Sequence, residues 1–453
     1  MKKSRHDLTQ GNIFKNLLHL AVPIFLSNLL QDAFNIVDMI FVGRLGSAAL
    51  AAVGLSGNLL RLIGVFALGI STGTAIMVAQ FIGAKKRAEG EDIAMQALIL
   101  CVVFAIGISC VGYLLAERGL RLMRTDDEEV IRLGVAYMQV TLLGMVTMFL
   151  SMTLNSIFRG AGDAVTPMIV LIFATVLNII LDPLLIFGWW KFPRLGVVGS
   201  AYATVIGRGV AAVIMLYLCF SGRGPISLKY VKRRINLSAM GQILRIGVFS
   251  SMQGFWRHLS RLGFMWFIGP YGKSAIAAYT VCMRLRVIVM TPGFGIANAV
   301  SPMVGQNLGA NQIDRAEKSA QIGNWVAIVM MSLIGILFFL FPQIFLGIFT
   351  NDMEVIGIGS LFLRYLSPTF GFIAISLVLG RALNGAGDTF SPMAITLICQ
   401  VGVGLILVIT ISYLIGLPGV WIGIALSNVL QGTMMWFWYR RGAWKAKKLV
   451  GEE

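Results

Sequence analysis

Charged side chains are scarce in this chain of 453 residues, at 13%, whereas apolar residues make up 57%. Soluble globular domains are usually about one quarter charged and about half apolar. The mean hydropathy of +0.82 and the long uncharged runs exclude a soluble protein with one compact core and indicate membrane insertion. The few charges give a net +17, which basic loops facing anionic lipid explain, so no nucleic-acid partner is expected.

Cysteine and histidine are also rare. The five cysteines are scattered through apolar segments, and there are three histidines. An odd number of cysteines without paired spacing predicts neither a disulfide framework nor a metal centre. Nucleotide-binding motifs and a paired catalytic constellation are missing, which disfavours an ATP-driven pump, a membrane enzyme or an ion channel. We expect no resident cofactor and no cleaved signal peptide, because the long first apolar run is typical of a retained span.

Apolar runs long enough to cross a bilayer, about 20 residues each, recur along the whole chain. They predict twelve spans, at about 16–41, 48–79, 92–116, 129–157, 166–189, 196–220, 240–268, 274–306, 317–341, 353–381, 391–414 and 418–438. With the N-terminus inside, the inner segments carry 21 Lys and Arg residues against 7 outside. This bias predicts cytoplasmic termini and a multi-pass protein of a bacterial or archaeal inner membrane.

An internal repeat organises the chain. Three motifs of the first half recur in the second half, in the same order and at an offset of 225 or 226 residues. The matched pairs are FVGRLGSAALAA at 41–52 with FIGPYGKSAIAA at 267–278, VAQFIGA at 78–84 with VGQNLGA at 304–310, and GAGD at 160–163 with GAGD at 385–388.

Because six spans separate equivalent positions, both halves enter the membrane from the same side. The sequence therefore predicts an all-α membrane protein with two six-helix lobes related by a pseudo-two-fold axis along the membrane normal. The lobes are expected at 1–220 and 238–453. A polar, basic cytoplasmic linker at 221–237 would join them.

These motifs resemble the multidrug and toxic compound extrusion (MATE) family of secondary transporters, and more closely its DinF-like branch. The resemblance covers nearly the whole chain and rests on VDMIFVGRLG at 37–46, RGAGDAVTPM at 159–168, their second-half partners, and VLNIILDP with its Asn178 and Asp182. It implies a monomeric efflux transporter that works by alternating access. Its partners would be the lipid bilayer and small organic substrates, often cationic or amphiphilic, exported in exchange for H⁺ or Na⁺.

Two aspartates stand out inside the predicted spans, Asp38 and Asp182, and Asp32 lies six residues before the first of them. A charged side chain at a helix centre is costly, so intramembrane carboxylates are candidates for function. The equivalent second-half residues are Phe264 and Leu407, both apolar. A purely architectural need would persist in both copies, so we expect cation exchange in the N-terminal lobe alone.

Polar residues on neighbouring spans extend this candidate site. Asn178 lies four residues before Asp182, on the same helix face. Tyr137 and Asn155 are eighteen residues apart, or five helical turns, and can share a face. With Thr204, a weaker match, these positions correspond to those used in the resembled family. Their oxygens and the two carboxyl groups can hold a proton or coordinate Na⁺; the alternative is that they only satisfy a kinked helix.

Pro23 lies inside the first span and removes a backbone hydrogen bond there. In DinF-like relatives, bending of this helix has been linked to protonation. The resemblance therefore implies a hinge at Pro23, and a static kink is the alternative.

The second half departs from the family pattern. Sodium-coupled relatives use an acidic residue in the seventh span, and this sequence has none there. Its seventh and eighth spans instead carry basic residues, including Arg257 and Arg284. In a substrate cavity these two would favour an anionic or lipid-phosphate group, whereas near the outer interface they would only snorkel. The alternative function is therefore a flippase or exporter of a lipid-linked or anionic substrate.

Overall fold

The computed structural model describes residues 7–123, 127–229, 231, 235–447 and 449, and within these residues every regular element is helical. Long apolar sequences form the helices, and glycine, proline or capping aspartate residues separate them. The chain divides into two compact units. Unit 1 comprises Leu26–Val78 and Lys86–Val248, and unit 2 comprises Asp7–Phe25, Ala79–Lys85 and Phe249–Glu453.

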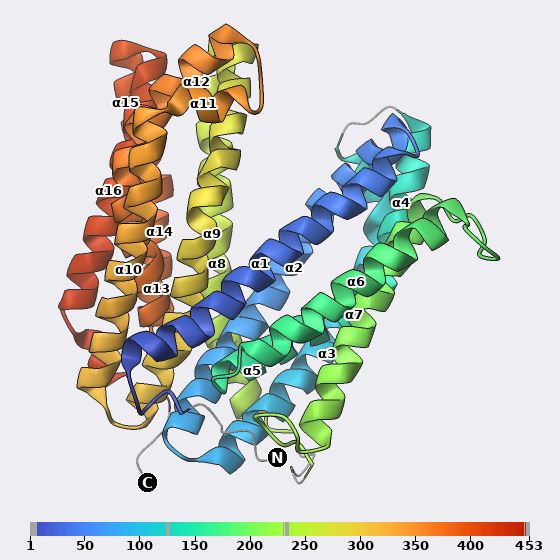
Figure 1. Ribbon diagram of the computed structural model, residues 1–453, viewed down its shortest axis with the longest axis vertical. Coiled ribbons are helices and arrows are strands. Elements are labelled where there is room, and N and C mark those ends of the chain that lie inside the picture. Colours follow the sequence, from blue (N-terminus) through green and yellow to red (C-terminus); the bar gives the residue numbers. More distant parts are fainter. Residues whose placement is uncertain (1–6, 124–126, 230, 232–234, 448, 450–453) are drawn as a thin grey trace. The chain divides into compact units, whose positions relative to one another are not determined.

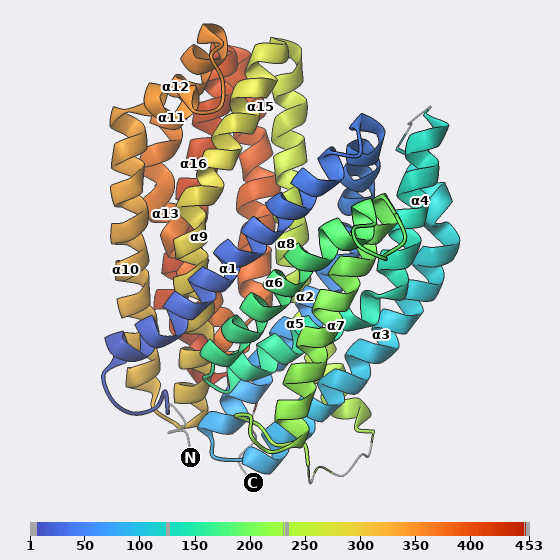
Figure 2. The ribbon, with the colours of Figure 1, turned by 45° about the vertical axis from the view of Figure 1, so that its right-hand side comes forward.

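Unit 1 holds most of the first-half helices, whose order can be followed in Figure 1. They are α1 (Ile13–Gly43), α2 (Ser47–Gly83), α3 (Arg87–Arg121), α4 (Glu128–Leu143), α5 (Met145–Gly160), α6 (Val165–Phe187) and α7 (Val197–Phe220). Helices α6 and α7 run side by side, and α7 also packs on α4 and α5 (Figures 1 and 2). Gly199 lets α7 approach the backbone of α6, because a Cβ there would collide with the carbonyl group of Leu185.

Unit 2 holds the second-half helices. After α8 (Leu237–Ile268) they are α9 (Lys273–Gly309), α10 (Ile313–Leu340), α11 (Pro342–Gly347), α12 (Met353–Leu366), α13 (Phe370–Gly385), α14 (Phe390–Thr396), α15 (Val403–Ile415) and α16 (Leu417–Arg440). Helix α13 packs against α9, α10 and α16, and α15 pairs with α16. Between α14 and α15 the chain forms a π-helical segment, Leu397–Gly402. Short π segments are rare and are often found at functional sites.

Ten helical segments of the described chain are long and apolar enough to cross a membrane, and an eleventh is the pair α4 and α5 if it forms one span. That pair is bent by 51° around Gly144. The remaining expected span is α8, which has 32 residues but carries several arginines that lower its hydropathy. The chain is therefore a multi-pass membrane protein.

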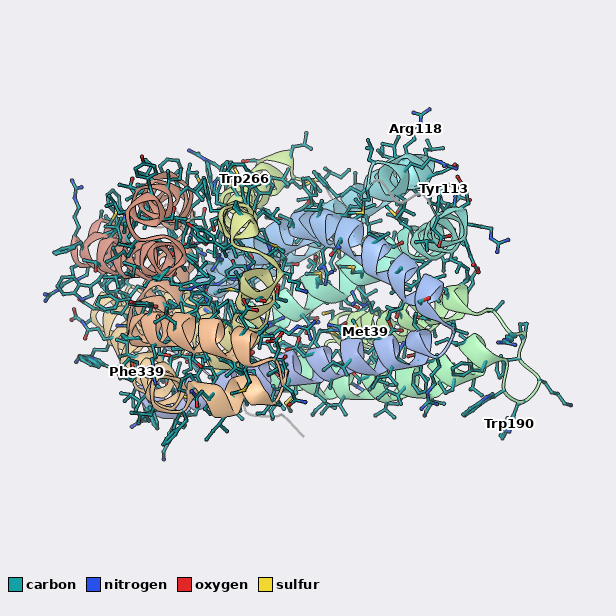
Figure 3. The ribbon with its side chains drawn as sticks, turned by 90° about the horizontal axis from the view of Figure 1, so that it is seen from above. Met39, Tyr113, Arg118, Trp190, Trp266 and Phe339 are labelled. Atoms are coloured by element: carbon teal, nitrogen blue, oxygen red, sulfur yellow. The ribbon has the colours of Figure 1, made fainter. Side chains whose placement is uncertain are left out.

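Large apolar side chains cover the outer surfaces of both units, as expected of helices that face lipid. Figure 3 shows Trp190 on the loop between α6 and α7, directed away from the helices of unit 1. Met39, Trp266 and Phe339 are also exposed.

The internal repeat is visible in the backbone. Residues with positive φ occur at matching places in the two halves, and most of them are glycines in tight turns. The pairs are Gly46 with Gly272, Lys85 with Asn311, Gly162 with Gly387, and Gly196 with Gly416. Asp127 and Asp352 also match, since each accepts hydrogen bonds from two backbone N–H groups at the start of a helix. Both halves therefore share one scaffold.

The GAGD motifs form helix-to-helix turns. In the first, Asp163 accepts hydrogen bonds from the backbone N–H groups of Val165 and Thr166. In the second, Asp388 accepts one from the Ser391 hydroxyl at 2.7 Å and forms an ion pair with Lys447. The motif thus stabilises the turn in both copies.

The compact units do not follow the predicted lobe boundaries. Helices α1, α2 and α8 each pass from one unit to the other, after Phe25, Val78 and Val248. The division into 1–220, 221–237 and 238–453 describes the repeat and stays a prediction. Residues 230 and 232–234 of the linker lie outside the described residues.

Candidate functional site

The first part of the site is the contact between α1 and α7 in unit 1. Asp38 is half-buried on α1, and its Oδ1 accepts a hydrogen bond of 2.5 Å from the hydroxyl of Ser200 on α7. Ser200 itself is fully buried. A hydroxyl can donate to a carboxylate or accept from a carboxylic acid, so this contact tolerates both protonation states of Asp38. Asp32, by contrast, is exposed.

The second part is Asp182 on α6, which is fully buried. The amide of Asn178 satisfies its neighbours when Nδ2 donates to Asp182 Oδ2 at 3.1 Å and Oδ1 accepts from the backbone N–H of Thr204 at 3.2 Å. The other carboxyl oxygen, Oδ1 of Asp182, has no hydrogen-bond partner among the described residues. A buried carboxylate oxygen without a partner is costly unless it carries a proton or binds a cation.

The third part of the site is Tyr137 on α4. It is buried in an apolar cluster with Val42 and Val197, among others. Its phenol lies close enough to both aspartates for electrostatic interaction, and the two aspartates are likewise close enough to interact with each other. The structure thus brings together Asp38, Asp182, Asn178, Tyr137 and Thr204.

Two predicted residues lie apart from this group. Asn155 bonds to its own helix, where Nδ2 donates to the Ser151 carbonyl at 2.9 Å, and not to the carboxylates. Pro23 is buried within α1, in the part of that helix that belongs to unit 2. It lies two residues before Phe25, after which α1 passes into unit 1. The coupling role of Asn155 and the hinge at Pro23 stay predictions.

Arg208 is a member of the site that the sequence reasoning missed. It is half-buried on α7, where Ser200, Thr204 and Arg208 follow at four-residue spacing and therefore share one face. Its guanidinium lies close enough to Asp38 and Tyr137 for electrostatic interaction. The signal was present, because Arg208 is the single charged residue in the apolar run at 196–220.

The basic residues of the second half form a separate group, in unit 2. Arg257 on α8 interacts electrostatically with three other arginines, Arg261, Arg286 and Arg381. Arg284 is exposed and lies two residues before Arg286 on α9, which places it on another side of that helix. Of the two arginines predicted to line a substrate cavity, the structure places Arg257 in this group and Arg284 outside it.

Known proteins resemble the chain over nearly its whole length. The curated relatives include a probable multidrug resistance protein, YoeA, of Bacillus subtilis, which is 29% identical and matches over 98% of this chain and 96% of its own. A protein named FAD transporter from Shewanella oneidensis is 26% identical, with 97% of each chain covered.

Among solved structures, an outward-facing multidrug resistance MATE family transporter of the MOP superfamily has a TM-score of 0.89 at 24% identity, covering 98% of this chain and 100% of that one. This likeness shows the two-lobe fold. The DinF-like branch stays a prediction. The MatE family model matches residues 23–184 and 255–410, which is more than half of the chain, and the chain therefore belongs to the MatE family of membrane transporters.

Proposed function

We propose that this protein is a secondary active transporter of the inner membrane that exports organic compounds in exchange for protons, with the exchange at Asp38 and Asp182. The observation that carries the proposal is Oδ1 of the fully buried Asp182, which has no hydrogen-bond partner among the described residues. Its neighbour Oδ2 already accepts from Asn178, so Oδ1 is the oxygen with room for a proton. Relatives named as multidrug resistance proteins support organic compounds as the exported class.

Two neighbouring carboxyl groups suit proton exchange. When both are ionised in an apolar site, their like charges repel each other, so one proton shared between them is held firmly. Water reaching the site stabilises the ionised forms and releases the proton. Alternating access would expose the pair to each side of the membrane in turn, so that proton entry on one side is tied to substrate exit on the other.

The surroundings of the carboxyl groups favour H⁺ over Na⁺ as the coupling ion. A bound Na⁺ needs several oxygen ligands, and Asn178 Oδ1 is already engaged by the Thr204 N–H group. The guanidinium of Arg208 also lies near Asp38 and opposes the binding of any cation there, Na⁺ and H⁺ alike. A proton needs one free oxygen only.

Pro23 is proposed as the hinge that lets α1 respond to this exchange. Proline leaves the carbonyl group one turn earlier without its helical partner, which allows a helix to bend. Asp38 lies on the same helix, four turns further on, within unit 1.

Both termini are proposed to be cytoplasmic. The protein is also proposed to belong to the DinF-like branch and to act as a monomer.

Efflux from proteoliposomes under separately imposed H⁺ and Na⁺ gradients tests this function. The substrate panel should include cationic dyes and organic anions, because the substrate class enters the proposal only as organic compounds. A pH gradient alone should drive export in the wild-type protein. If only a Na⁺ gradient drives it, the coupling ion is wrong, and if neither gradient does, the antiport proposal fails.

A further inference from the structure

In the described part of the chain, the arginine group of unit 2 has no acidic partner. Arg257 and Arg261 are four residues apart on α8, Arg286 lies on α9 and Arg381 on α13. Arg257 interacts electrostatically with the other three, and Arg286 also with Arg261. Among the described residues, none of the ion pairs involves any of these four arginines. Arg257, Arg286 and Arg381 are half-buried, and Arg261 is exposed. Like charges near one another in a membrane-spanning segment are unfavourable unless an anion joins them.

A chain of buried amide and hydroxyl groups lies next to Arg286. Asn428 Oδ1 accepts from Arg286 Nη2 at 3.5 Å and from Gln400 Nε2 at 3.2 Å. Gln400 Nε2 also donates to Gln431 Oε1 at 2.8 Å, and Gln431 Nε2 donates to Thr396 Oγ1 at 3.0 Å. Gln400 reaches this network from the π-helical segment Leu397–Gly402.

Two hydrogen-bond donors in this network have no partner among the described residues. Arg286 Nε and Asn428 Nδ2 are both buried without a hydrogen-bond partner in the described part of the chain. A buried donor without an acceptor is costly, since it has given up its bond to water. The same side chains would be satisfied by a ligand that supplies acceptor oxygens.

From these observations we infer that the arginine group, Arg257, Arg261, Arg286 and Arg381, with Asn428 beside it, binds an oxyanion on the transported compound. The substrates are therefore organic anions that carry a phosphate or carboxylate group. Guanidinium groups match both oxyanions because their planar N–H forks donate two parallel hydrogen bonds. Four positive charges would repel the cationic compounds that the family resemblance favours. This inference deepens the proposed export function and rests on it.

Matched pairs of compounds test the anion site without any gradient. The purified full-length protein in lipid nanodiscs is titrated with riboflavin 5′-phosphate and riboflavin, with adenosine monophosphate and adenosine, and with naphthaleneacetate and naphthaleneacetamide. Each pair differs in one anionic group. The anion of at least one pair should bind at least about tenfold more tightly than its neutral partner, the difference typical of a charge-assisted bond. The phosphate and carboxylate pairs distinguish the two sources of an oxyanion, and equal binding within every pair overturns the inference.

Variants locate the site. Arg286→Gln should remove most of the anion preference, and Arg364→Gln, which changes the same charge on the exposed face of α12, should keep it. Arg257→Gln is the second variant in case Arg286→Gln does not fold. It should weaken anion binding without lowering the melting temperature of the ligand-free protein, because it removes one of several like charges. Unchanged anion preference in both cluster variants overturns the inference.

One further variant separates this inference from the proposed antiport. Asp182→Asn removes the carboxylate of unit 1 and leaves unit 2 intact. It should lose gradient-driven export and keep anion binding in nanodiscs. Anion binding with no proton-driven export in the wild-type protein would reject the antiport alone, whereas proton-driven export with no anion preference would reject the anion site alone.

Discussion

The candidate sites of units 1 and 2 carry opposite charges on one duplicated scaffold. The turns, caps and left-handed residues recur in both halves. The carboxyl groups Asp38 and Asp182 lie in unit 1, whereas the arginines around Arg257 lie in unit 2. The turns and helix caps were thus kept after duplication, while the polar side chains within the helices diverged. In the proposed mechanism one copy exchanges a cation and the other holds an anion, so the two tasks of an antiporter do not compete for the same residues.

The largest effect is expected from neutralising the carboxyl groups of unit 1. Asp38→Asn and Asp182→Asn should each reduce proton-driven efflux by about 100-fold or more, a change of about 2.7 kcal/mol in the barrier. Asparagine keeps the shape of the side chain but cannot exchange a proton. Efflux in proteoliposomes measures the loss, and size-exclusion chromatography confirms the fold. Wild-type rates in both variants would remove the cation site from unit 1.

Arg208 is a basic residue beside the carboxyl groups of unit 1. Its removal therefore makes the charges of the two candidate sites differ more. Arg208→Gln should lower proton-driven efflux about tenfold, by analogy with the loss of one charge-assisted contact. It should also let Na⁺ slow efflux by competing for the carboxylates, because the repelling guanidinium is gone. Efflux with and without Na⁺ at constant pH checks this. Insensitivity to Na⁺ would show that Arg208 does not select the ion.

Ser200 offers a finer test of unit 1. Ser200→Ala deletes the hydrogen bond that the Ser200 hydroxyl donates to Asp38. The loss of this bond should remove about 1–2 kcal/mol of stabilisation, so efflux should become several-fold slower. Ser200→Thr restores a hydroxyl and should recover most of the rate. If both variants behave alike, the hydroxyl does not act on Asp38.

The smallest effects are expected at the two predicted residues that the structure sets apart. Asn155→Ala should change efflux less than about twofold, because its amide bonds to its own helix. Arg284→Gln should leave the anion preference of unit 2 unchanged, in contrast to Arg286→Gln. Equal effects of the two arginine variants on binding would show that the anion site extends across both sides of α9.

The apolar runs and the repeat were sufficient to predict a membrane protein of two related halves, because insertion and duplication both leave linear patterns. Asp38, Asp182 and Asn178 were also predictable, since a polar residue stands out in an apolar run. Ser200 was not, because a serine does not stand out there and only the packing of α7 on α1 pairs it with Asp38. The choice between Arg284 and Arg286 likewise depends on which side of α9 faces α8. The bend at Gly144 interrupts a run that reads as one continuous span.

The π-helical segment indicates how the two halves came to differ. At the GAGD turns the halves are offset by 225 residues. The carbonyl group of Leu185, on which Gly199 packs, and that of Ile411, on which Gly419 packs, are instead 226 residues apart. Leu397–Gly402 lies between these landmarks and has the geometry expected where one residue is inserted into an α-helix. Each residue turns a helix by about 100°, so one added position was enough to reorient Gln400 without redesigning the helix. Deleting one residue there should return the segment to the α-helical form of its first-half counterpart.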